Sequence, residues 1–359
     1  MGSVAEISGQ DDVAWAARNE YWSAQNDRLR RPRGKHERPR DPLILCGHGV
    51  SLKIDKGTLL IRDGFTHWPQ ERREFRLFKG ARDLPPRIVM LDGSGSLSFD
   101  VVSWLSEQGV PLVRVNYQGD VASVIGGAGF AMCPDKVRWQ IETRDDPEKR
   151  LAFSCDLIGR KLESSLETLR IAIPAKVAAP AITRTEAALE KVGNGSVATI
   201  DELRMIEAVA AGAYFSSWQG LQLEWRSRRH HPIPDAWLTI NGRNSIGGGR
   251  SLSNRNAKHP LNAVLNYAYG LLYSQVQIEL VAEGFDPRRG IMHHDRKEAD
   301  ALAFVFDMVE PRRAGIDAKV LKFMLSSAFT GADFVIRADG VCRLSPQLAR
   351  RVCQVVAGH

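Results

Sequence analysis

Cysteine is scarce in this chain, and its cysteines are not arranged in a pattern that binds zinc or forms a disulfide framework. No two of them form a Cys-x-x-Cys pair, and their number is odd. They are Cys46, Cys133, Cys155, Cys342 and Cys353. This spacing predicts neither a structural zinc site nor a set of disulfides. A reducing cytoplasm is therefore the location that we expect.

Long hydrophobic runs are also missing. No stretch of the sequence approaches the roughly 18 to 20 apolar residues that a membrane span requires. The first residues, MGSVAEISGQDDVAW, are acidic and have no apolar core, so we expect no secretory signal. The sequence thus favours a protein without a membrane partner.

Several catalytic motifs are absent too. There is no Gly-x-Ser-x-Gly elbow, and no cysteine stands in a recognisable Cys–His setting. The GSGS segment at 93–96 lacks the spacing and the lysine of a phosphate-binding P-loop, so we interpret it as a turn that leads into a helix. These absences leave no support for nucleophilic serine or cysteine catalysis.

The composition is that of a globular, mildly basic protein. The chain has 359 residues, of which 43% are hydrophobic, and 49 Lys and Arg stand against 42 Asp and Glu for a net charge of +7. A chain of this length favours two domains, and its apolar residues are numerous enough to form a hydrophobic core. The charge is compatible with nucleic acid, although many basic enzymes bind none.

The distribution of strand and helix signals along the sequence predicts an α+β fold, in which a small β-rich N-terminal domain precedes a larger all-α domain. Residues 1–40 form a basic, partly disordered arm with seven Arg and Lys between Arg28 and Arg40. This arm is either solvated or contacts phosphates. Residues 41–125 form the β-rich domain, 126–135 the linker and 136–359 the all-α domain.

Local signals place several elements within these segments. Short apolar or alternating runs such as LILC, VSLKI and RIVMLD predict strands, and the helix after the GSGS turn should end at Gly109. Thr199 and Glu202 form a capping box for the helix that contains Glu207. Pro260 opens a long helix that runs to about Glu283, before Gly284.

Carboxylates set into apolar helical stripes are the most informative chemistry in the sequence. Glu207 shares a stripe with Leu203, Ala210, Ala211 and Tyr214. Asp307 and Glu310 follow the apolar run ALAFVF, and His293 lies between the two acidic segments. Such carboxylates are costly unless a cation or a donor meets them. Together these residues suggest one divalent metal ion held by several helices.

The same segments resemble a known family. LNAVLNYAYGLLYSQVQIELVAEGFDPRRGIMHHD and DMVEPRRAGID are similar to the CRISPR spacer-acquisition integrase, a metal-dependent nuclease. The resemblance extends over roughly residues 41–359 and is more specific in the helical half. It implies that Glu207, His293 and Glu310 bind Mg²⁺ or Mn²⁺, and that Asp307 is an adjacent acid that supports the catalytic site. Considered alone, Glu207 could equally be a helix residue in a salt bridge, and His293 could be an ordinary loop histidine.

Two departures from the family pattern leave the histidine ligand open. His293 lies seventeen residues before Glu310, whereas the family spacing is about fifteen. The Gly-x-x-His pattern favours His293, but His294 and Asp295 remain alternatives. The segment PRRAG also stands where the family tends to have an aromatic and a proline around the Arg, while Asp317 still matches the acid that follows. These differences indicate a divergent branch.

A polar, glycine-rich segment between the Glu207 helix and the long helix carries four basic residues: Arg243, Arg250, Arg255 and Lys258. We interpret them either as contacts to the DNA backbone or as a solvated face. Tyr267, Tyr269 and Tyr273 on the long helix are interpreted as core and interface residues rather than base-stacking ones. His230 and His231 are adjacent, which is poor spacing for shared metal ligation.

The resemblance implies the following function. The β-rich domain forms a homodimer, which binds a small ferredoxin-like adaptation subunit and double-stranded DNA, both protospacer and CRISPR repeat. The 3′-hydroxyl of a short DNA fragment attacks a phosphodiester at the repeat boundary, and a metal ion neutralises the developing charge. Two other readings stay open: a mobile-element integrase outside CRISPR, and a non-catalytic DNA-binding scaffold of the same fold.

Overall fold

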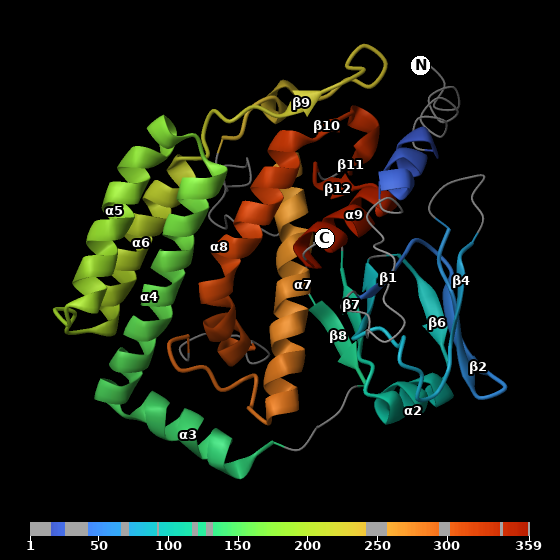
Figure 1. Cartoon of the computed structure of the whole chain (residues 1–359), viewed down its shortest axis with the longest axis horizontal. Coiled ribbons are helices and arrows are strands. Elements are labelled where there is room, and N and C mark those ends of the chain that lie inside the picture. Colours follow the sequence, from blue (N-terminus) through green and yellow to red (C-terminus); the bar gives the residue numbers. More distant parts are fainter. Residues whose placement is uncertain are drawn as a thin grey trace.

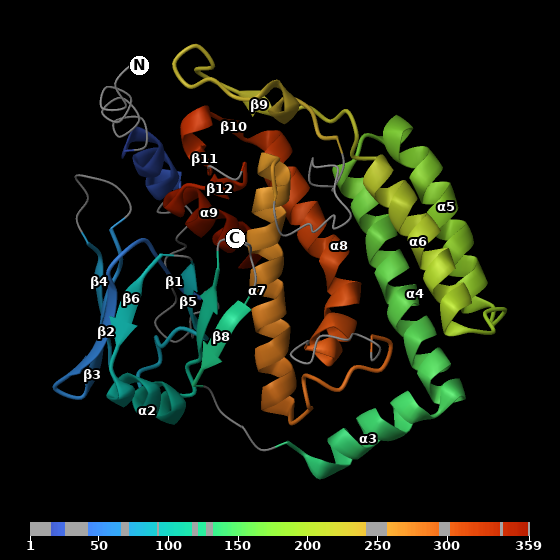
Figure 2. The same cartoon turned by 180° about the vertical axis from the view of Figure 1, so that it is seen from behind.

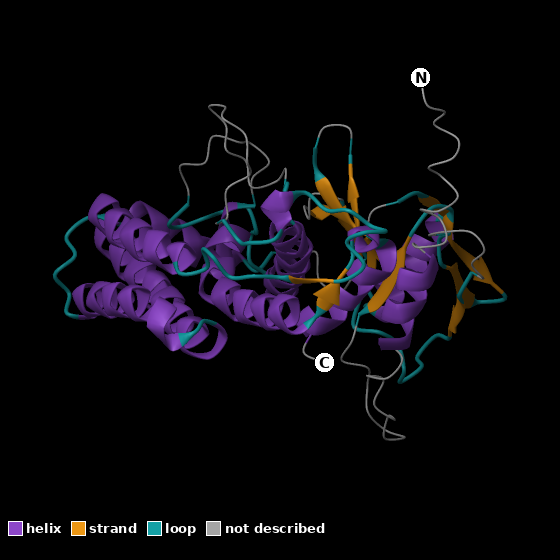
Figure 3. Cartoon of the chain, turned by 90° about the horizontal axis from the view of Figure 1, so that it is seen from above, coloured by secondary structure: helices purple, strands orange, loops and turns teal. Residues whose placement is uncertain are grey.

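The computed structural model describes residues 16–25, 42–65, 72–91, 93–116, 121–126, 132–241, 257–293, 302–337 and 340–357. Strands β1 to β8 gather on one side of the molecule and the long helices on the other, as Figures 1 and 2 show from opposite directions. The same division is clear from above in Figure 3. The predicted α+β class is confirmed.

The first sheet joins the two halves of the molecule. Its order is β1 (Leu43–Cys46), β5 (Ile88–Leu91), β7 (Leu112–Val115) and β8 (Val121–Ile125), with β8 alone antiparallel to its neighbour. Successive side chains of a strand point to opposite faces. Val89 accordingly packs into a core shared with the helices, while Ile88 packs toward the second sheet. Burial on both faces explains why these strands are almost entirely apolar.

The second sheet covers the outer face of the first. Its order is β4 (Glu74–Leu77), β3 (Thr58–Arg62), β2 (Val50–Asp55) and β6 (Gly95–Leu97). Lys56 and Gly57 form the turn between β2 and β3, and both have positive φ angles, 50° and 78°, as a tight hairpin turn requires.

Helix α2 (Phe99–Gln108) packs beside the two sheets. It ends at Gly109, whose φ of 62° and N–H bonds to Leu105 and Ser106 carbonyls complete the cap. The predicted helix stop at this glycine is thus confirmed.

The second half of the chain is mostly helical. Its long helices are α3 (Pro134–Asp145), α4 (Pro147–Ala172), α5 (Ala175–Gly193), α6 (Ile200–Ser216), α7 (Pro260–Glu283), α8 (Ala303–Ser326) and α9 (Pro346–Ala357). No helix in the described ranges is long and apolar enough to cross a membrane.

This half also contains short strands, which the prediction of an all-α domain had left out. They pair as β9 (Glu224–Trp225) with β10 (Ala328–Phe329) and as β11 (Phe334–Ile336) with β12 (Cys342–Leu344). Strands of two or three residues are too short to show a hydrophobic period. The 3-10 turns η1 (Asp235–Trp237) and η2 (Gly331–Asp333) were not predicted either.

The predicted ends of α6 and α7 agree with the structure. Thr199 Oγ1 accepts the N–H of Glu202 at 3.1 Å, although the Glu202 carboxylate accepts the N–H of Ala198 rather than that of Thr199. Pro260 is the first residue of α7, and Gly284 ends it with a φ of 87°.

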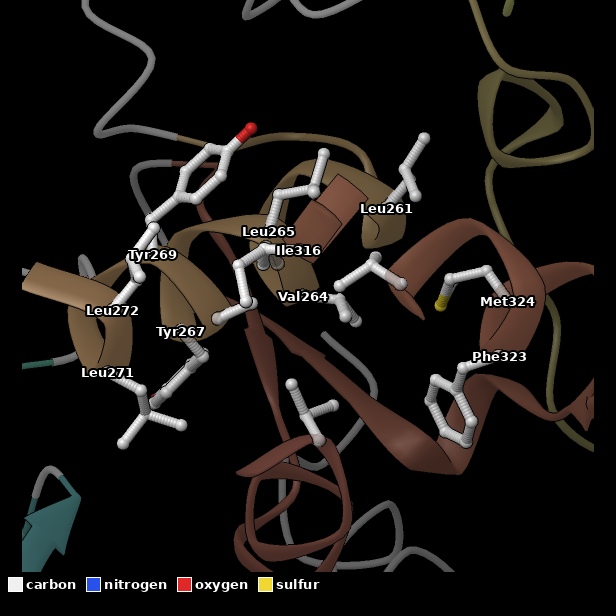
Figure 4. Packing of buried hydrophobic residues seen from close by; sticks show 14 of the residues in the cluster. Leu261, Val264, Leu265, Tyr267, Tyr269, Leu271, Leu272, Ile316, Phe323 and Met324 are labelled. Carbon is white, nitrogen blue, oxygen red and sulfur yellow. The ribbon is translucent and has the colours of Figure 1, made fainter. Parts of the chain in front are cut away.

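Helix α7 is the centre of the largest hydrophobic core. It is buried almost all round over its first half, as expected of a helix that is apolar on every face. Figure 4 shows Leu261, Val264 and Leu265 of α7 near Ile316, Phe323 and Met324 of α8. Helix α9 closes the same core against β1 and β5, and Arg350 of α9 forms a buried ion pair with Asp63.

Part of the predicted arm is a docked helix. Residues 16–25 are helical, and Trp22 is buried against Phe323 and Phe329, with ring centroids 5.6 and 5.9 Å away. Arg18 pairs with both carboxylate oxygens of Asp333, at 2.7 and 2.8 Å. The basic segment 28–40 and residues 127–131 of the predicted linker lie outside the described residues, so the domain boundaries stay a prediction.

Candidate active site

Three helices bring two carboxylates and a lysine together. Glu207 comes from α6, Glu310 from α8 and Lys161 from α4. The ammonium nitrogen of Lys161 lies 2.6 Å from Oε2 of Glu310 and donates a hydrogen bond to Oε1 of Glu207. The side chains are 17%, 23% and 9% exposed for Lys161, Glu207 and Glu310. One positive charge is thus shared by two carboxylates at a largely buried position.

Helix packing explains why these groups meet. Helix α4 lies against α8, α5 and α6, and Leu157, Ile158 and Leu162 form part of its buried face. Lys161 is placed within this stripe, three or four residues after the first two. Because the stripe faces the neighbouring helices, its long side chain runs between them and its charged end reaches the carboxylates.

Glu310 is held ionised by its surroundings. Burial by itself would raise the pKa of this carboxyl group, but the positive charges of Lys161 and Arg313 outweigh that effect and hold the pKa at about 2. Arg313 donates to Oε1 of Glu310 over 3.1 Å. The two carboxylates in turn raise the pKa of Lys161, against the effect of its burial. Glu310, Lys161 and Arg313 are therefore charged near neutral pH.

Asp307 connects His293 to helix α8. Its fully buried carboxylate accepts the ring Nδ1–H of His293 at 2.7 Å. It also accepts the backbone N–H groups of Ile291, Met292 and His293, at 2.6, 3.2 and 3.1 Å. In the neutral imidazole, a carboxylate that accepts the Nδ1–H leaves the lone pair on Nε2. Asp307 therefore sets both the position of this loop and the orientation of the imidazole.

The approach of this loop to α8 depends on a glycine. A Cβ atom added to Gly290 would lie 2.6 Å from the Cβ of Ala303 and 3.0 Å from its carbonyl carbon. From the other side, Arg204 of α6 donates to the carbonyl oxygen of Met292 at 3.3 Å. The His293 loop is thus fastened to both helices that carry the glutamates.

A small cavity of roughly 60 Å³ extends from the two glutamates into the helical core. Its lining includes Lys161, Glu207, Glu310, Tyr214, Tyr269 and Asp317. The hydroxyl groups of both tyrosines donate to Asp317, that of Tyr214 at 3.0 Å. Tyr269 is buried, as predicted for a core residue, and the guanidinium of Arg313 lies 4.8 Å from its ring centroid. This network holds α6, α7 and α8 together behind the carboxylates.

The donor set fits a hard divalent cation. Carboxylate oxygens with an imidazole nitrogen suit Mg²⁺ or Mn²⁺, and the two glutamates already converge on one cationic atom. Oε2 of Glu310 is buried, and the Lys161 ammonium nitrogen lies 2.6 Å from it. Within the described residues, no three His, Cys, Asp or Glu side chains form a ready coordination shell, and the Lys161 ammonium group contacts both glutamates.

Sequence reasoning missed Lys161 and Arg204. A lysine inside the apolar stripe of α4 was the available signal, but its partners lie 46 and 149 residues further along the chain. His294, Asp295, Arg243, Arg250 and Arg255 lie outside the described residues. Lys258 is described as half-buried, and its carbonyl oxygen accepts the Trp237 Nε1–H at 2.8 Å. The DNA contacts assigned to these basic residues stay a prediction.

Comparison with known proteins identifies the family. A family model described as CRISPR associated protein Cas1 matches residues 43–357, so the chain belongs to the Cas1 family, as its sequence predicted. It is 29% identical over 316 residues to a CRISPR-associated endonuclease Cas1 of Thermus thermophilus, and the match covers 87% of this chain and 84% of that protein. A Cas1 endonuclease of Archaeoglobus fulgidus is 22% identical, with 86% and 85% covered.

Some related proteins match over a smaller part of their length. The match to a Cas1 endonuclease of Methanospirillum hungatei is 30% identical and spans 44% of this chain and 41% of the relative. Fusions of a Cas4 exonuclease with Cas1 from Leptospira interrogans and Geobacter sulfurreducens are matched over 43% and 24% of their length. The chain thus spans less than half of each of these three relatives.

Solved structures share the fold. A casposase bound to integration product has a TM-score of 0.69 at 22% identity, over 88% of this chain and 81% of the other. A Cas1 protein from Thermotoga maritima has a TM-score of 0.64 at 17% identity, over 89% and 91%. A Cas6-RT-Cas1–Cas2 complex has a TM-score of 0.65 at 18% identity, over 91% of this chain and 33% of the other.

Proposed function

We propose that this Cas1-family protein is a metal-dependent DNA endonuclease and integrase that inserts short DNA fragments into a CRISPR array. The observation that carries the proposal is the convergence of Glu207 and Glu310 on one cationic atom, beside an imidazole that Asp307 orients. A site of this charge and donor type suits phosphoryl transfer, in which negative charge develops on phosphate oxygens.

The metal-binding residues in this proposal are Glu207, Glu310 and the Nε2 atom of His293. A bound Mg²⁺ or Mn²⁺ would polarise the phosphodiester and stabilise charge on the attacking and departing oxygens. Glu310 contributes a carboxylate that stays ionised, since its pKa is about 2. Asp307 keeps the imidazole in the tautomer that presents Nε2, which is the role of an outer carboxylate in many metal sites.

The reacting groups come from DNA in this scheme. The 3′-hydroxyl of the incoming fragment forms a new bond to phosphorus, and the 3′-oxygen of the target strand leaves. With water as the nucleophile, the same residues support hydrolysis, which is the endonuclease activity named for the relatives. The guanidinium of Arg313, which pairs with Glu310 and lies over the Tyr269 ring, holds that carboxylate in place.

The β-rich half offers a surface for the proposed homodimer. All three residues of the edge strand β6 are exposed, and Phe99, directly after it, is 91% exposed. An exposed sheet edge beside a large apolar side chain suits association with a second copy. We further propose double-stranded DNA and a small ferredoxin-like adaptation subunit as partners, in line with the Cas2 named in the complex of similar fold.

A mobile-element integrase outside CRISPR is the second candidate. The casposase of similar fold supports it, but at 22% identity this likeness concerns the fold alone. The third reading, a non-catalytic scaffold, has less support because Glu207 and Glu310 contact one ammonium group, and His293 contacts Asp307, one helical turn before Glu310.

A strand-transfer assay tests the proposal. A short duplex with free 3′-hydroxyl ends is incubated with supercoiled plasmid, Mn²⁺ and the wild-type protein or its Glu207→Ala variant. The proposal predicts plasmid joining by the wild type, none after chelation with EDTA, and none with dideoxy 3′ ends. Glu207→Ala should lose joining while DNA affinity stays unchanged or rises slightly, because a negative charge beside phosphate is removed.

Comparison of target plasmids separates the candidates. Joining confined to plasmids with a CRISPR repeat favours the adaptation role. Joining that ignores the repeat favours the mobile-element integrase. DNA binding without any joining, under all metal conditions, would indicate the scaffold and contradict the catalytic proposal.

A further inference from the structure

Lys161 occupies the position that a divalent cation would need in order to contact both glutamates. Its ammonium nitrogen contacts Oε1 of Glu207 and lies 2.6 Å from Oε2 of Glu310. The two glutamates belong to different helices, and α4 supplies the lysine from a third. The side chain is only 17% exposed, so this contact is a part of the helix packing.

The charges around this position show what the lysine does there. Two carboxylates that face each other in a partly buried site repel, and burial strengthens the repulsion. Glu310 has a second ion-pair partner, because Arg313 pairs with its Oε1. Among the described residues, the ion-pair partner of Glu207 is Lys161. The lysine therefore neutralises the repulsion between α6 and α8.

We propose that Lys161 is a resident counter-ion that holds Glu207 and Glu310 together while the metal site is empty, and that a divalent cation displaces its ammonium group on binding. The inference rests on the proposed function, since it takes the two glutamates as metal ligands. Two cations cannot both lie between the same pair of oxygens. The flexible four-carbon stem of lysine allows the ammonium to move aside.

Displacement has two measurable consequences. Because the metal must compete with the ammonium, removal of the lysine charge should tighten metal binding. Because the glutamates then repel in the metal-free protein, the same change should lower its thermal stability, and a bound metal should restore more stability than it does in the wild type. A residue with a purely structural role would lower stability without tightening metal binding.

The experiment titrates the full-length protein with Mn²⁺ by calorimetry and follows thermal unfolding with and without Mn²⁺. Lys161→Gln, which keeps hydrogen-bond donors but no charge, should bind Mn²⁺ about tenfold more tightly than the wild type. Its unfolding midpoint should be lower without metal and should rise further on addition of Mn²⁺. Lys161→Arg keeps the charge and should stay close to the wild type in affinity.

A matched control lies next to this residue. Arg160 is 48% exposed and pairs with Asp156 on the surface of α4, so Arg160→Gln should change neither the affinity nor the Mn²⁺-dependent stabilisation. If Lys161→Gln is too unstable for calorimetry, Lys161→Met tests the same loss of charge in a side chain of similar length. Unchanged or weaker Mn²⁺ binding by these variants overturns the inference.

Glu207→Gln distinguishes failure of this inference from failure of the metal assignment. If Glu207→Gln weakens Mn²⁺ binding but the Lys161 variants do not tighten it, the metal site stands and the displacement of Lys161 is wrong. If Glu207→Gln leaves Mn²⁺ binding unchanged, the metal does not bind at this position. Both the proposed function and the inference about Lys161 then fall.

Discussion

The carboxylate of Asp307 accepts the ring Nδ1–H of His293 at 2.7 Å and, through the same two oxygens, the N–H groups of three consecutive residues that end at His293. One buried side chain of α8 thus fixes both the backbone and the imidazole of the loop that precedes it. Asp307, which directly follows the apolar run ALAFVF, is therefore a positioning residue, and Glu310, one turn later, faces the Lys161 ammonium group.

Asp307→Asn should lower strand-transfer activity about 10- to 100-fold, as loss of an outer carboxylate does in many metal sites. The amide keeps the shape but can present its NH₂ group to the imidazole, which favours the other tautomer. Steady-state rates at saturating Mn²⁺ measure the effect. In the background of His293→Ala, Asp307→Asn should cost much less, since the ring that it orients is gone; full additivity of the two changes would contradict the coupling.

Gly290→Ala should destabilise the protein by roughly 1–3 kcal/mol, because the new methyl group would overlap Ala303 at the start of α8. The loop that carries His293 would have to move away from the helix, so activity should fall as well. Denaturant unfolding of the purified variant provides the free energy. Gly315 lies in α8, and a Cβ atom added to it would have no neighbour within 4 Å. Gly315→Ala should therefore be neutral or stabilising by up to about 1 kcal/mol. Equal effects of the two substitutions would argue against the close approach.

Acid should destabilise the metal-free protein in part through Glu310. Its folded-state pKa of about 2 lies below the ordinary value of 4.5. The stabilisation is therefore fully present above about pH 4.5 and is lost as the pH falls toward 2, with a total on the order of 3 kcal/mol. Glu310→Gln should be less stable near neutral pH, and its unfolding free energy should fall less steeply over this window. Urea unfolding of chelated samples at several pH values measures these free energies. Parallel curves for the wild type and Glu310→Gln would show that this carboxyl group is not responsible.

Phe99→Asp should convert the proposed dimer into a monomer. The side chain is 91% exposed, so its replacement removes no packing within the chain and should leave the thermal unfolding of the monomer nearly unchanged. Light scattering at micromolar concentration should report twice the chain mass for the wild type and the chain mass for the variant. Ile171→Asp, which changes a 69% exposed residue in the helical half, serves as the control. A wild-type monomer, or a dimer that survives Phe99→Asp, would remove this surface from consideration.

Local sequence patterns determined several features of this protein. Pro260, Gly109 and Gly284 mark helix ends because their backbone preferences act within a few residues. The apolar strand runs predicted the β-rich first half for the same reason. The order of Glu207, His293, Asp307 and Glu310 identified the family. In the structure Glu207 and Glu310 contact Lys161, and His293 contacts Asp307. Their roles as ligands remain a proposal.

The tertiary structure decided what depends on contacts between distant segments. Lys161 becomes part of the site only because α4 packs against α6 and α8. Its position in the apolar stripe of α4 does not by itself identify its partners, which lie on distant helices. The helix at 16–25 and the strand pair β9–β10 are stabilised by partners some 100 to 300 residues away, such as Asp333 for Arg18. A short segment has too few local contacts to specify its own structure. Its conformation is set by the surface against which it folds.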